Sequence, residues 1–191
     1  YGREDLLASI ATLDNEFSMP GLHRRKPPRY EAFFTARNSG LTSVTLTARS
    51  ALKQSDAEAF FALGDRLAAA LQVVYGFTHL VLNESSDAYA SAGRLTSKEL
   101  QQYGPRSIGT RTWIGPYIAT LLGNAALSSL EVPHQENDWG GVRIDLVLQP
   151  WAADGAELDA RLQTVMTQLA PSGVFGDYSQ VLSYRAGPCW H

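Results

Sequence analysis

Hydrophobic and polar residues alternate along two stretches in the first half of the chain, residues 30–38 and 43–50. Alternation with a period of two is typical of a strand that has one buried face. A short turn that contains Gly40 separates the two stretches, so together they predict a β-hairpin. A third apolar stretch, residues 77–83, predicts another strand.

Between these strands the apolar residues change to a helical spacing. Ser55 and Glu58 are placed as in a capping box, and Gly76 supplies a stop, so we expect a helix between them. Its buried stripe is expected to be Phe60, Gly64, Leu67, Leu71 and Val74. Helical spacing also predicts a short amphipathic helix over residues 4–13.

The same order of elements returns in the second half. Strands are expected at residues 130–137 and 140–148, and they meet around glycines that admit a positive φ. On the second strand, one face is expected to carry Val142, Ile144, Leu146 and Leu148, and the other Arg143 and Asp145. Asp154 and Glu157 then begin a helix, and the stretch from Val174 onward predicts a final strand. The buried stripe of that helix is expected to be Leu158, Leu162, Val165 and Leu169.

These patterns predict an α+β fold, a mainly antiparallel sheet with helices on a face of it. We expect a single domain over residues 1–191, built from two similar ββαβ halves, residues 30–83 and 130–178. A helical insertion, residues 84–129, is expected between the halves. One of its helices is predicted from Thr96 and Glu99 as a capping pair, the other from Pro116 at a first turn.

Composition narrows the possible functions. The chain has 45% hydrophobic and 18% charged residues, with a formal net charge of −3. This mild acidity argues against a nucleic-acid binder, which needs a basic face, and permits an acidic patch that meets a basic partner. No apolar run reaches the length of roughly 18 residues that a membrane span requires. The single cysteine, Cys189, excludes a multi-cysteine zinc site, and a free thiol fits a reducing compartment.

Candidate chemistry concentrates at His134, Glu136 and Asp138, which are two residues apart and would share one face of an extended strand. One interpretation is a site of a small enzyme or of a ligand-binding module. The other is a solvated edge strand that leads into a hairpin turn. The usual catalytic signatures are missing from the sequence, so we expect no enzyme, no catalytic residue, no metal and no cofactor.

Three segments together resemble a family of bacterial immunity proteins from polymorphic-toxin systems, immunity family 52. They are "LLASIATLD" near the start, "RTWIGPYIATLLG" (111–123) and "DWGGVRIDLVLQPWAADGAELDARLQTVMTQL" (138–169). The last is the most specific, with a Trp-Gly-Gly turn, an alternating strand, a Pro-Trp pair and a capped helix. The segments cover about half of the chain.

The resemblance implies a cytoplasmic protein that binds and neutralises a cognate type VI secretion toxin by stoichiometric protein–protein interaction. In this family the toxin carries a restriction-endonuclease-like nuclease domain. A nuclease grips phosphates with a basic surface, which carboxylates near hairpin tips can meet. The candidate toxin-binding residues are therefore Glu84, Asp87, Glu136 and Asp138.

Overall fold

The computed structural model describes residues 52–79, 95–180 and 183–190, together with four strands nearer the start of the chain. The chain divides into two compact units, Tyr1–Asp56 and Ala57–His191, and each is described by itself. The single domain over residues 1–191 stays a prediction. The helix expected over residues 4–13 lies outside the described residues.

The first unit contains a four-stranded antiparallel sheet. Its strands are β1 (Phe17–Ser18), β2 (Leu22–Arg24), β3 (Tyr30–Ala36) and β4 (Thr42–Ala48). Strands β3 and β4 pair along their whole length, from Tyr30 opposite Ala48 to Ala36 opposite Thr42. The hairpin predicted from the alternating pattern is thereby confirmed. Strands β1 and β2 both pair with β3 as well.

The second unit is built around another four-stranded antiparallel sheet, in the order β5-β6-β8-β7. These strands are β5 (Tyr75–Thr78), β6 (Arg111–Ile114), β7 (His134–Glu136) and β8 (Val142–Asp145). Strand β6 lies inside the segment predicted as a helical insertion, so that description of residues 84–129 was wrong in this part. The four residues of β6 are too few to show a clear alternation of hydrophobic and polar positions, so the sequence pattern did not reveal this strand. In the structure β6 is an inner strand that pairs with β5 and β8.

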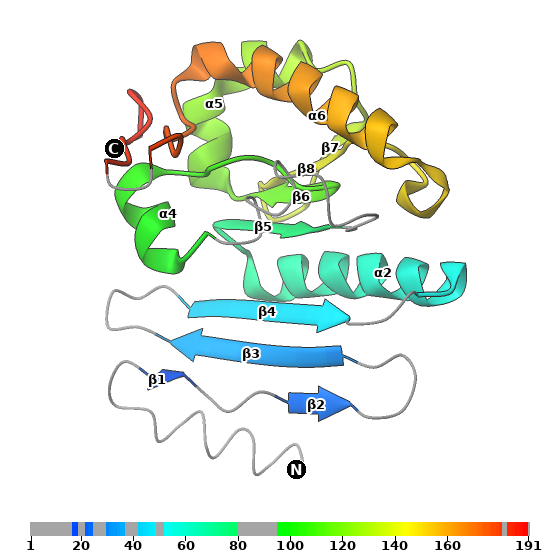
Figure 1. Cartoon of the computed structure of the whole chain (residues 1–191). Helices are drawn as coiled ribbons and strands as arrows, with labels where there is room; N and C mark the ends of the chain where they lie inside the picture. Colours follow the sequence, from blue (N-terminus) through cyan, green and yellow to red (C-terminus); the bar gives the residue numbers. More distant parts are fainter. Residues whose placement is uncertain are drawn as a thin grey trace. The chain divides into compact units, whose positions relative to one another are not determined.

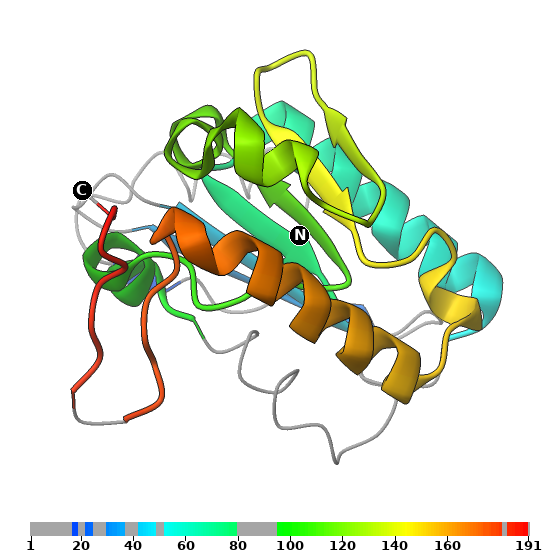
Figure 2. The same ribbon diagram turned by 90° about the horizontal axis from the view of Figure 1, so that it is seen from above.

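Helices cover both faces of this sheet (Figure 1). The described helices are α2 (Gln54–Leu71), α4 (Ser97–Tyr103), α5 (Pro116–Ser128) and α6 (Gly155–Leu169), with short 3-10 turns at Pro150–Ala152 and Ala170–Ser172. Residues 57–71 of α2 lie over one face, and α5 and α6 lie over the other, where Figure 2 shows α6 crossing above the strands. The α+β prediction is confirmed, with the second face of the sheet covered too.

The main hydrophobic core fills the space between the sheet and the pair α5 and α6. The predicted stripe of α6 is confirmed, because Leu158, Leu162, Val165 and Leu169 are all buried there. Helix α6 begins as expected, with the Asp154 carboxylate accepting a hydrogen bond of 2.7 Å from the Glu157 amide. Trp190 closes one end of this core at 6% exposure, and its indole N–H donates to the Gln101 carbonyl oxygen at 3.1 Å.

Both helix starts predicted in the middle segment are also found. The Thr96 hydroxyl accepts from the Glu99 amide at 3.2 Å, and the Glu99 carboxylate accepts from the Thr96 amide at 2.8 Å, which completes the capping box. Pro116 occupies the first turn of α5. Both helix starts could be predicted from the sequence because each depends on residues that are only a few positions apart.

Helix α2 departs from the prediction at both ends. It begins at Gln54, so Ser55 lies inside its first turn, and it ends at Leu71, where Gln72 takes a left-handed φ of 46°. Gly76 belongs to β5. The expected stripe was also misplaced, since Leu71 is 55% exposed and the buried residues of α2 are Ala57, Phe61 and Ala68. Two of these three buried residues are small alanines, which a count of large apolar residues passes over.

The two similar halves are not confirmed. Strand β5 pairs with β6 from the middle segment. The final strand expected from Val174 onward is reduced to one isolated bridge between Asp177 and Arg185. Leu148 is 70% exposed, contrary to expectation, because β8 ends at Asp145 and the chain turns away from the sheet.

Candidate functional site

The β7–β8 hairpin, which holds the candidate residues of the sequence, closes through a tight loop. In this loop the Asn137 amide donates to the Gly141 carbonyl at 2.7 Å, and the Gly140 amide donates to the Asn137 carbonyl at 2.9 Å. Gly140 has a φ of +82°, a conformation that L side chains rarely adopt. The expectation that a glycine here provides a positive φ is confirmed.

Packing holds the tip of this hairpin in place. The Trp139 ring lies so close to Gly141 that a Cβ atom on Gly141 would be 2.2 Å from it. On the other side, a Cβ atom on Gly140 would lie 3.5 Å from Pro116, at the start of α5. The tip therefore packs on its own tryptophan and lies against Pro116 of α5.

The structure keeps two of the three candidate residues on one face of a strand and places the third in the turn. His134 and Glu136 lie on β7 and Asp138 lies in the turn, and all three are exposed. The His134 ring nitrogen Nδ1 is 3.1 Å from the Val132 carbonyl oxygen. Asp138 is outside the strand, so the prediction that all three residues share one face was wrong. The reason is that the extended backbone ends at Glu136, where the turn begins.

Glu84 and Asp87, the other two candidate residues, lie outside the described part of the chain. Among the described residues, no group of three or more histidine, cysteine, aspartate or glutamate side chains is placed to hold a metal ion. His134 and Glu136 are residue types that bind metals. In the part of the chain that the structure describes, no third side chain of this kind completes a metal-binding group with them.

A hollow of about 210 Å³ lies next to β7. Its lining residues are Asn124, Leu127, Ser128, His134, Glu136 and Val142. Helix α5 is interrupted at Gly123, whose φ is +76°, and the segment after this break supplies the first three of them. The hollow therefore combines one carboxylate, an imidazole, an amide and a hydroxyl with two apolar side chains.

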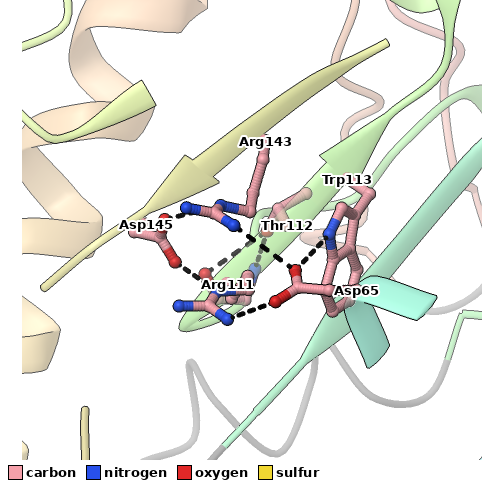
Figure 3. A network of polar contacts seen from close by, with 7 residues as sticks. Asp65, Arg111, Thr112, Trp113, Arg143 and Asp145 are labelled. Atoms are coloured by element: carbon pink, nitrogen blue, oxygen red, sulfur yellow. Dashed lines mark hydrogen bonds and ion pairs between the residues drawn. The ribbon is translucent and has the colours of Figure 1, made fainter. Parts of the chain in front are cut away.

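A second polar cluster, which the sequence did not predict, lies on the face of the sheet covered by α2 (Figure 3). Arg111 faces Asp145 across the β6–β8 pairing, and Arg143 is the neighbour on β8. The Arg143 Nε donates to Asp145 at 2.9 Å, and the Arg111 Nε donates to the other carboxylate oxygen of Asp145. Asp145 is only 2% exposed, so these bonds satisfy a carboxylate that water hardly reaches.

Asp65 of α2, the helix that covers this face of the sheet, completes the charge cluster. Its carboxylate accepts from the Arg111 Nη1 at 2.8 Å and from the Trp113 indole N–H at 3.0 Å, and it lies 3.6 Å from the Arg143 Nη1. Two carboxylates thus meet two guanidinium groups, and their formal charges cancel. Such a cluster helps to fix where α2 lies on the sheet, because Arg111, whose side chain is 12% exposed, is held between Asp65 of the helix and Asp145 of the sheet.

The close approach of α2 to Trp113 explains a glycine in the middle of the helix. A Cβ atom on Gly64 would be 2.4 Å from the Trp113 ring, which leaves no room for any other side chain. One turn earlier on α2, the Phe61 ring lies under the Arg111 guanidinium, with the ring centroid 5.1 Å from Cζ. The cluster is therefore framed by aromatic rings.

His79 lies just after β5 and is partly buried. Its Nδ1 is 3.3 Å from the Thr110 hydroxyl oxygen, and Thr110 is fully buried. Burial lowers the pKa of His79 to about 4, so the ring is neutral at physiological pH. This environment agrees with a structural role for the residue.

No protein-family model, no curated protein and no solved structure matches the chain. In the described residues, no helix has both the length and the apolar character needed to cross a membrane.

Proposed function

We propose that this protein is an immunity protein that binds a basic partner protein through the β7–β8 hairpin. Following the family resemblance, the partner is a cognate type VI secretion toxin with a restriction-endonuclease-like nuclease domain. The protein neutralises it in the cytoplasm by forming a stoichiometric complex.

The observation that carries this proposal is the exposure of carboxylates on a hairpin that is already ordered. Glu136 and Asp138 are exposed at its edge and turn, and the preceding Glu131 is exposed as well. Because Trp139 packs on Gly141 and Gly140 lies against Pro116, we expect the hairpin to lose little conformational freedom on binding. Exposed acidic groups steer a basic partner during encounter and pair with its Arg and Lys side chains.

The size of the hollow favours a partner side chain over a small molecule. Its volume of about 210 Å³ is below the roughly 300–1,000 Å³ of typical ligand pockets. A ligand-binding module or small enzyme that uses His134, Glu136 and Asp138 would also need these groups to converge, and Asp138 lies in the turn.

Co-expression with the product of the adjacent open reading frame, followed by co-purification, tests the complex itself. Association rates of the Glu136→Lys/Asp138→Lys variant then test the hairpin. We expect the variant to associate at least about tenfold more slowly at low ionic strength, and by a smaller factor at high salt, because screening removes steering.

The matched control is Glu157→Lys/Asp177→Lys, which changes the net charge equally at exposed acidic residues outside the hairpin. It should retain most of the wild-type rate at both ionic strengths. Equal slowing in both variants would show that only the overall charge matters, and would remove the hairpin from the interface. Failure of the wild type to co-purify would reject the immunity function.

A further inference from the structure

We propose that β7 binds an extended, basic segment of the partner as an additional strand of the sheet. A lysine or arginine of that segment would enter the hollow beside Glu136. This inference rests on the proposed function, because it specifies how the partner engages the hairpin.

The hydrogen bonds of β7 leave its outer edge open. The Asp145 amide donates to the Pro133 carbonyl at 2.9 Å, and Asn137 bonds to Gly141 beyond the other end of β7. In an antiparallel ladder, bonded and non-bonded pairs alternate, so the bonded pair between these two is Gln135 with Arg143. The backbone N–H and C=O groups of His134 and Glu136 therefore point away from β8.

β7 is also the last strand in the order β5-β6-β8-β7, so none of the described strands pairs with that edge. Its three side chains are all exposed. An edge of this kind is a template for another strand, which main-chain hydrogen bonds would hold.

The side chains of the edge determine which strand would suit it. His134 pairs with Ile144 and Glu136 with Val142, so both side chains lie on the face that carries α5 and the hollow. An added strand would lie about 4.8 Å from β7, with every second side chain on that same face. A lysine or arginine there would reach the Glu136 carboxylate and extend toward the polar groups of Asn124 and Ser128.

Charge favours a basic segment over a second copy of this chain. Two copies joined along β7 would each bring Glu131, Glu136 and Asp138 to the shared edge, and like charges across a strand pair are destabilising. A segment of alternating lysine and apolar residues would instead neutralise these carboxylates.

Amide hydrogen exchange measured by NMR tests the inference on the full chain. The probe is a capped peptide of alternating lysine and valine, about six residues long as in a typical strand. At saturating peptide, exchange at the His134 and Glu136 amides should slow by at least about tenfold, because both would gain an acceptor. The Gln135 amide, which already bonds to Arg143, should change little.

Two variants separate the backbone contact from the charge. Glu136→Pro removes an outward-facing donor and leaves the bonds to β8, and edge strands tolerate proline at such positions. It should abolish the peptide-induced protection of His134, with the protected Gln135 amide reporting that the hairpin still folds. Glu136→Gln keeps the donor, so it should weaken the peptide affinity and retain the same pattern of protection.

Unchanged exchange at His134 and Glu136 would overturn the inference, as would equal protection by a peptide in which glutamate replaces lysine. Protection that appears without peptide and rises with protein concentration would assign the edge to self-association and would also overturn it. If the toxin binds wild type and the Glu136→Pro variant equally well, strand addition is wrong while the immunity function stands. Peptide protection without toxin binding would reject the function and retain the edge.

Discussion

Beneath α5 and α6, the β5–β8 sheet presents Ile114, Val142 and Ile144, each at most 4% exposed among other apolar side chains. Beneath α2, the alternate positions of the same strands present Arg111, Arg143 and Asp145. Both faces are covered by helices. The first is held by apolar contacts, which are not directional. The second combines the packing of Phe61 and Trp113 with a cluster in which two carboxylates each contact two guanidinium groups.

The two faces differ in how much stability a substitution in each of them removes. An apolar face loses stability in proportion to the atoms removed and can partly close the gap. In a buried ion cluster, removing one member leaves its partners desolvated and unpaired, even though the intact cluster contributes little net stability. The charge cluster is therefore better understood as a device that sets the position of α2 than as a source of stability.

Breaking the charged face should give the largest effect. Asp145→Ala leaves Arg111 and Arg143 with Asp65 as the one carboxylate of the cluster, so one positive charge loses its partner. We expect a loss of about 3–5 kcal/mol in the free energy of unfolding. Urea denaturation of wild type and variant measures it. The exposed residue Asp138 is the control, and Asp138→Ala should stay within about 0.5 kcal/mol of wild type. A loss below about 1 kcal/mol for Asp145→Ala would show that water solvates the cluster.

On the apolar face, Leu162→Ala should cost about 2–5 kcal/mol, because Leu162 is 4% exposed and the change leaves a cavity under α6. The same denaturation experiment measures it, with Leu148→Ala as the control at a side chain that is 70% exposed. If the two variants lost equal stability, α6 would not pack on the sheet as described.

The smallest expected effect is a pH dependence of the free energy of unfolding, caused by His79. His79 has a pKa lowered to about 4 by burial, compared with about 6.5 when unfolded. The unfolded chain binds this proton first, so the stability contribution is complete above about pH 6.5 and is lost as the pH falls toward 4. Between pH 7.5 and 5 the loss should be about 2 kcal/mol.

Urea titrations of wild type and His79→Leu at these two pH values measure the loss. The variant should lose about 2 kcal/mol less than wild type over this interval. Leu148→Ala, at an exposed apolar side chain, should keep the wild-type pH dependence. An identical pH dependence in wild type and His79→Leu would mean that the ring of His79 is hydrated.

The elements that the sequence predicted well are those whose signals lie close together along the chain. Asp154 with Glu157 and Thr96 with Glu99 define helix starts within one turn, and the apolar stripe of α6 repeats over its whole length. The exposure of Glu136 and Asp138 was expected from the hairpin pattern. Their role in binding stays a prediction.

The charge cluster could not be predicted in the same way. Arg143 and Asp145 alternate with apolar residues, which is also the pattern of a strand with one solvated face. Their burial depends on α2, whose Asp65 is separated from Arg111 by 46 positions along the chain. Only the three-dimensional contact between helix and sheet distinguishes a covered polar face from a solvated one.

The core of the second unit can be completed only after Trp190 has been synthesised. Its indole bonds to Gln101 across 89 positions, and its ring belongs to the main core. A ribosome that adds about 5–20 residues per second synthesises the intervening chain in roughly 4–18 s. During that interval α4 and the core near it lack the contacts that Trp190 makes.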